Sequence, residues 1–128
     1  FKAVQIAVSA WTAEALKQTL SASIFSRSTE CHNQDKVSMG TIAARDASRV
    51  IVLTEQVIAA LCCASVQAIQ LKALDGSLAE VLAAFQAWVL QTFDYVVEDR
   101  PLQHELQQLV DRFENLELLN SERVHSIG

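Results

Sequence analysis

The chain is organised around one stretch, residues 29–45, which reads Thr29-Glu30-Cys31-His32-Asn33-Gln34-Asp35-Lys36-Val37-Ser38-Met39-Gly40-Thr41-Ile42-Ala43-Ala44-Arg45. Polar side chains crowd its first half. Its second half opens a run of about forty residues with no proline and one early glycine, which predicts a long helix from about Lys36 to Leu74. Free N–H groups and the dipole at a helix start favour anions, so the stretch is a candidate substrate site. The alternative is a capped loop, with Asp35 as the N-cap.

Working outward, the apolar spacing predicts three more helices. One covers residues 2–20. A second follows the stop at Asp75-Gly76 and the capping box Ser77–Glu80 and extends to Phe93. The last has Pro101 in its first turn and reaches about Leu119. We therefore expect an all-α bundle of about four helices with one long central helix (about 36–74). Residues 1–128 would form a single segment, with 120–128 as a flexible tail.

Composition narrows the class of protein further. The 128 residues are 51% hydrophobic, enough for one core, and the net charge of −5 argues against nucleic acid as a partner. Three cysteines with neither metal spacing nor a disulfide pattern indicate a reducing cytoplasm and no metal site.

One uncharged stretch, residues 56–71, could also be interpreted as a membrane-spanning helix. Its sixteen residues are fewer than the roughly 20 that a span needs, and three of them are glutamines. A helix that is apolar nearly all round is expected instead in the centre of a bundle, so we predict burial and no membrane partner. The chain begins at Phe1, inside a helical pattern and with no signal peptide, which suggests a piece of a larger protein.

The central stretch closely resembles the aromatic amino acid ammonia-lyase and aminomutase family, which includes the histidine, phenylalanine and tyrosine ammonia-lyases. The matching residues are His32-Asn33-Gln34-Asp35, Val37-Ser38-Met39-Gly40 and Ala43-Ala44-Arg45. The resemblance extends from about Val4 to about Leu119 and concerns the C-terminal part of such enzymes. It implies that the complete enzyme eliminates ammonia from an aromatic L-amino acid, or moves the amine to the β-carbon.

The resemblance also implies roles for three residues. In the family this motif lies beside the electrophilic 4-methylideneimidazol-5-one (MIO) group, so Gln34 and Asn33 are predicted catalytic residues. Glu30 matches a carboxylate near the substrate amine. Gln34 stands where the phenylalanine and tyrosine enzymes carry Gln and the histidine enzymes Glu, which favours a non-imidazole substrate. Judged by residue type alone, all three are more simply interpreted as loop residues that satisfy local backbone groups.

Two family features are absent from residues 1–128. MIO forms from Ala-Ser-Gly, which does not occur here, and the family's catalytic Tyr has no counterpart, because Tyr95 lies in the wrong region. We therefore expect the chain to be inactive alone and to need a missing N-terminal portion, with a homotetramer as the family's assembly. The alternative is a non-catalytic helical oligomerisation module derived from this family.

Two other groups of residues have simpler readings. Cys31 and His32 are not expected to act as a nucleophile pair, because adjacent side chains usually point apart and nothing orients the base. Arg45, Asp46 and Arg49 are expected to form a solvated or intersubunit cluster of charges.

Overall fold

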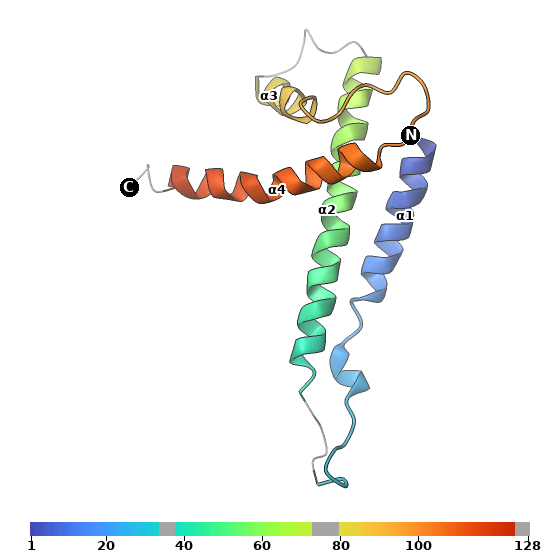
Figure 1. Ribbon diagram of the computed structural model, residues 1–128, viewed down its shortest axis with the longest axis vertical. Coiled ribbons are helices and arrows are strands. Elements are labelled where there is room, and N and C mark those ends of the chain that lie inside the picture. The colour runs from blue at the N-terminus through green and yellow to red at the C-terminus, as the bar shows by residue number, and fades with distance from the viewer. Residues whose placement is uncertain (34–37, 73–79, 125–128) are drawn as a thin grey trace.

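The structure, a computed structural model, describes residues 1–33, 38–72 and 80–124, and in residues 114–124 only the backbone. Its elements are four helices and one 3₁₀ turn, with no β-strand in the described ranges (Figure 1). They are α1 (Lys2–Lys17), η1 (Ala22–Phe25), α2 (Gly40–Leu71), α3 (Glu80–Val89) and α4 (Gln103–Val124). The predicted all-α class with one long helix is confirmed.

The long helix α2 is the axis of the molecule. Its 32 residues span about 48 Å at 1.5 Å per residue. α1 lies alongside one part of it, and α4 crosses it on another side (Figure 1). α3 lies near the C-terminal end of α2, while η1 and the loop residues 26–33 lie toward its N-terminal end (Figure 1).

α2 begins at Gly40, which corrects the predicted start at Lys36. Ser38 and Met39 are not helical, and the hydroxyl of Ser38 accepts a hydrogen bond from the N–H of Gly40 at 3.4 Å. A serine side chain that bonds to the backbone in this way competes with the helical ladder, so the helix begins after it. The predicted cap Asp35 and the predicted end Leu74 lie outside the described residues.

The other helix ends also differ from prediction. α1 ends at Lys17 because Thr19 closes a turn. Its N–H and its hydroxyl both donate hydrogen bonds to the carbonyl of Leu16. α3 ends at Val89 rather than at Phe93, because the N–H groups of Thr92 and Phe93 both donate to the Val89 carbonyl and close a turn. Phe93 is then buried in the core, at 1% exposure.

α4 differs from prediction at both ends. It begins at Gln103, so Pro101 precedes the helix and does not lie in its first turn. It continues to Val124, beyond the predicted Leu119. The predicted capping box over residues 77–79 lies outside the described residues.

The core gathers at one end of α2. Ala59, Cys63 and Val66 of α2 pack against residues of the later elements, namely Val89, Phe93, Leu102 and Leu109. The segment between α3 and α4 is held by Gln67, whose amide donates to the carbonyl of Val96 at 3.2 Å and accepts from its N–H at 2.9 Å. Two backbone groups are thus satisfied by one buried side chain.

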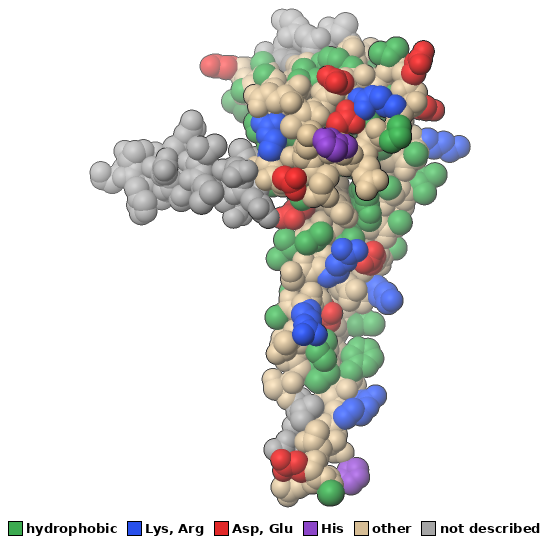
Figure 2. Space-filling view, in the orientation of Figure 1, with side chains coloured by type: hydrophobic (Ala, Val, Ile, Leu, Met, Phe, Trp, Pro, Cys, Tyr) green, Lys and Arg blue, Asp and Glu red, His purple; other side chains and the backbone are tan. Residues whose placement is uncertain are grey.

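The rest of α2 is less covered than the sequence predicts. Within residues 56–71 one side is buried, but Ile58 is 44% exposed and Leu61 63% exposed. The prediction of burial on nearly all sides is therefore wrong for this chain, because α1, α3, α4 and η1 pack on α2 and still leave part of residues 56–71 exposed. By length and composition α2 could cross a membrane, a test that core helices of soluble proteins also pass. Figure 2 shows apolar side chains interspersed with charged ones along the long, narrow part of the molecule that α1 and α2 form.

Candidate functional site

The polar loop before α2 has an unusual backbone. Glu30, Cys31 and His32 are all left-handed, with φ values of 53°, 55° and 69°, and none of them is glycine. The N–H of Asn33 closes the turn onto the carbonyl of Glu30 at 2.9 Å. Side chains with a Cβ adopt this conformation rarely and at some cost, and such residues cluster at functional sites.

Two side chains brace the loop from within. The Oγ of Ser28 lies 2.8 Å from the Nδ1 of His32. His32 is therefore bonded to Ser28 across four residues, and its adjacent Cys31 is an exposed free thiol. This pairing gives His32 a role in holding the turn together.

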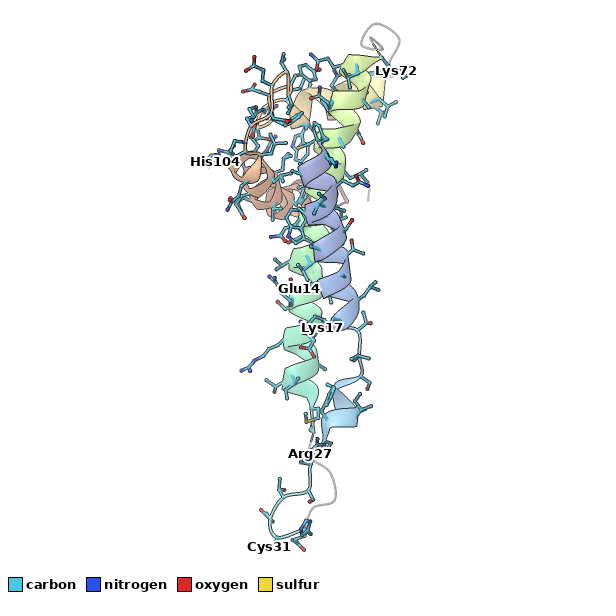
Figure 3. All side chains as sticks on the ribbon, turned by 90° about the vertical axis from the view of Figure 1, so that its right-hand side faces the viewer. Glu14, Lys17, Arg27, Cys31, Lys72 and His104 are labelled. Atoms are coloured by element: carbon cyan, nitrogen blue, oxygen red, sulfur yellow. The ribbon has the colours of Figure 1, made fainter. Side chains whose placement is uncertain are left out.

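Two of the three predicted site residues fall in this turn. Glu30 and Asn33 belong to the same turn and both are exposed, so the loop presents a carboxylate and an amide to the surroundings. Gln34 lies outside the described residues. The loop is at the tip of the molecule, far from the core, as the position of Cys31 shows (Figure 3). Chemically, such a tip can supply one polar wall of a site, with the other walls coming from elsewhere.

The charged residues at the start of α2 are arranged differently from the predicted cluster. Arg49 bonds to Glu14 of α1, with nitrogen–oxygen distances of 2.7 and 2.8 Å. The pair thus joins two helices of the same chain. Sequence reasoning missed Glu14 as the partner because the two residues are 35 positions apart. Arg45 is exposed on the same helix.

Cavities in the described part of the chain lie away from the loop. One of about 470 Å³ is bounded by α1, α2 and the start of α4, with Trp11, Gln56 and Arg100 among its walls. Another, of about 510 Å³, lies between the end of α1 and the residues Ala43 to Ile51 of α2. Neither includes Glu30 or Asn33, so the turn does not enclose a site by itself.

In the described residues, a polar, strained and exposed turn precedes a long apolar helix. Residues 1–90 match the aromatic amino acid lyase family, and the chain belongs to it.

Two relatives place the chain within that family. It is 31% identical over 90 residues to a histidine ammonia-lyase of Bacillus subtilis (strain 168), covering 70% of this chain and 18% of the relative. Its fold is similar to that of tyrosine aminomutase from Streptomyces globisporus, with a TM-score of 0.81 and 28% identity. That likeness covers 94% of this chain and 23% of the other. The chain thus spans about a fifth of the length of the relatives it matches.

Proposed function

We propose that this chain is the C-terminal helical segment of an ammonia-lyase or aminomutase that acts on an aromatic L-amino acid. The observation that carries the proposal is the turn from Glu30 to Asn33, in which site-type residues are held in a strained conformation at the mouth of α2. Its exposure supports a site completed by other segments. Family membership gives the reaction class, a carbon–nitrogen lyase.

Each polar residue of the turn has a role in this proposal. The carboxylate of Glu30 accepts hydrogen bonds from the ammonium group of the substrate, a charge-assisted pairing. The amides of Asn33 and Gln34 each offer one acceptor and two donor hydrogens, which suit them to fix one orientation of a polar group. The strained backbone of the turn sets the side chains of Glu30 and Asn33 before the substrate arrives, which lowers the entropic cost of alignment.

The electrophile must come from outside residues 1–128. MIO supplies the electrophilic carbon in the complete enzyme, and it forms from an Ala-Ser-Gly that this stretch does not contain. Residues 1–128 are therefore not its source. We propose accordingly that the chain is inactive alone and acts with an N-terminal portion in a cytoplasmic homotetramer.

The choice of substrate rests on Gln34. A neutral amide at this position favours a phenylalanine- or tyrosine-type substrate over an imidazole. The two relatives divide on this point, since one is named for histidine and the other for tyrosine. Phenylalanine, tyrosine and histidine therefore all belong in the test.

The test is complementation. Residues 1–128 are produced alone and together with the N-terminal portion of a family enzyme, and arylacrylate absorbance is followed with each of the three amino acids. We expect no product from the chain alone and product from the mixture. The Gln34→Ala and Glu30→Gln variants should each lower that activity, while Thr29→Ala, next to the turn, serves as the control.

Two outcomes would contradict the proposal. Product from the 128-residue chain alone would show that it needs no external electrophile. A folded, associated mixture that reacts with none of the three amino acids would favour the non-catalytic oligomerisation module instead.

A further inference from the structure

A cavity lies between α1 and the start of α4, against the middle of α2. Its volume of about 470 Å³ falls within the range of about 300–1,000 Å³ that is typical of small-molecule pockets. All the residues around it belong to the described ranges. Because neither Glu30 nor Asn33 is among them, this cavity is separate from the polar turn.

The walls of the cavity follow from helical spacing. Val4, Ala7 and Trp11 recur at intervals of three and four residues and share one face of α1. Leu106 and Val110 are one turn apart and share a face of α4. Two largely apolar helix faces therefore bound the same space, and the short side chain of Ala7 leaves room between them. The half-buried indole of Trp11 offers a flat surface on which an aromatic ring can stack.

One polar group in the wall lacks a partner. Gln56 of α2 lines the cavity, and in the described part of the chain its buried Oε1 accepts no hydrogen bond. A buried carbonyl oxygen without a donor is costly, so such groups are nearly always paired in folded proteins. The last torsion of a glutamine side chain is soft, and rotation about it turns this oxygen toward the cavity. A ligand with an N–H or O–H there would supply the bond that the chain does not.

The charge at the edge of the cavity is already neutralised. The guanidinium of Arg100 donates to the carboxylate of Glu105 at 2.6 Å and to the carbonyl of Asp94 at 2.7 Å. An anionic ligand would compete with Glu105 for this group, and a cationic ligand would be repelled by Arg100. The walls therefore favour a neutral molecule.

We propose that this cavity binds a neutral aromatic small molecule of the phenol or indole class, which donates a hydrogen bond to the Oε1 of Gln56. Its ring lies between the apolar faces of α1 and α4, beside Trp11. The apolar walls select the ring, the unpaired oxygen selects the donor, and the neutralised Arg100 excludes a net charge. This binding site is independent of the proposed lyase function, because it uses other residues of the chain.

Matched probes test the hydrogen bond. Indole carries an N–H, 1-methylindole has the same ring system without that donor, and quinoline offers only an acceptor. In the ¹⁵N-labelled chain, indole should shift the side-chain N–H signal of Trp11, assigned with Trp11→Phe, and not that of Trp88, with a Kd on the order of 1 mM. It should bind about fivefold more tightly than either of the other probes. Equal affinities, tightest binding of quinoline, or no shift of Trp11 would overturn the proposal.

Substitutions identify the acceptor. Gln56→Met keeps a similar side-chain size without the amide, so the fivefold preference for indole should disappear while 1-methylindole binds as before. The matched control is Gln107→Met, because Gln107 lines the same cavity but its amide already donates to Asp111 at 2.9 Å. This variant should keep the preference. Loss of the preference in both variants, or in neither, would contradict the assignment of Gln56.

A variant outside α2 tests the cavity without changing Gln56. Ala7→Leu fills the space between the two apolar faces, so it should weaken the binding of all three probes by at least about tenfold. Circular dichroism checks that the helices are retained. Indole binding that survives this substitution in the folded chain would place the ligand elsewhere and overturn the proposal.

The same titration in a larger assembly separates a free ligand from a side chain. An aromatic side chain of another segment would also fit the cavity, so the titration is repeated with the N-terminal portion used for complementation. Indole binding that persists in the mixture supports a site for a free small molecule. A Trp11 signal that shifts on mixing and no longer responds to indole would assign the cavity to a side chain and overturn the small-molecule site. Lyase activity is measured separately, so either proposal can fail without the other.

Discussion

At the residue scale, buried amide side chains hold neighbouring segments against the end of α2 where the core lies. Gln67, 7% exposed, satisfies both backbone groups of Val96. Gln86 donates to the hydroxyl of Tyr95 at 2.9 Å. Two amide side chains therefore attach the segment between α3 and α4, which has no helical ladder of its own.

Gln67→Ala should lower the free energy of unfolding by about 1–3 kcal/mol, because it leaves the partly buried N–H and carbonyl of Val96 without these partners. Urea unfolding followed by circular dichroism measures this. Gln108→Ala, at an exposed position of α4, should change stability by less than about 0.5 kcal/mol. Similar losses in both variants would show that the bonds to Val96 contribute little.

The stability of the chain should also depend on alkaline pH through Cys63. Burial, then the neighbouring Cys62 and Glu105, raises the pKa of the Cys63 thiol from 9.0 to about 12. The unfolded chain therefore loses this proton first, so the stabilisation is complete below pH 9 and is lost as the pH rises toward 12. The slope is at most about 1.4 kcal/mol per pH unit.

The measurement is urea unfolding between pH 8 and pH 11 for the native chain and Cys63→Ala. The native chain should lose stability more steeply over this range, whatever the cost of the substitution at pH 8. Parallel profiles would refute the role of Cys63.

At the scale of elements, one arginine ties α4 to α3. The guanidinium of Arg112 lies 4.5 Å from the ring centre of Trp88 and donates to its carbonyl at 2.9 Å. Its other arm donates to Gln91 at 2.8 Å, and Trp88 stacks on Phe113. A planar fork that stacks and donates twice makes a contact that lysine cannot reproduce.

We expect Arg112→Lys to destabilise the chain by about 1–2 kcal/mol despite keeping the charge. Thermal unfolding measures the change, and near-ultraviolet circular dichroism should show an altered tryptophan environment. Arg45→Lys, at an exposed position on α2, is the matched control and should have little effect. Full stability of Arg112→Lys would mean that the charge alone suffices.

At the scale of the whole molecule, one end of the chain is well packed, whereas its elongated part leaves large apolar side chains exposed. The core gathers where α3 and α4 meet α2, whereas the loop that contains Cys31 lies at the opposite tip of the molecule (Figure 3). Exposed large apolar residues occur on α1, η1 and α2, including Leu16, Phe25 and Ile51. Their number indicates that the native environment of this chain includes a partner surface.

The midpoint of thermal unfolding should therefore rise with protein concentration, because association stabilises the folded state by mass action. Differential scanning calorimetry from about 1 to 100 μM checks this, and Ile58→Glu should reduce the dependence. A midpoint that is independent of concentration, with a monomer at every step, would contradict self-association.

The sequence by itself determined the helical class, the long apolar helix and the family, because periodicity and a contiguous motif are local features. It also located Glu30 and Asn33 in one polar stretch. The start of α2 at Gly40 is seen only in the structure, because the apolar pattern does not show that Ser38 bonds to the backbone of Gly40. Only it decided that Gln67 holds Val96 and that Glu14 pairs with Arg49, because these partners are 29 and 35 residues apart. The exposed part of α2 likewise became visible only once its neighbours were placed, since burial depends on what packs against a helix as well as on its composition.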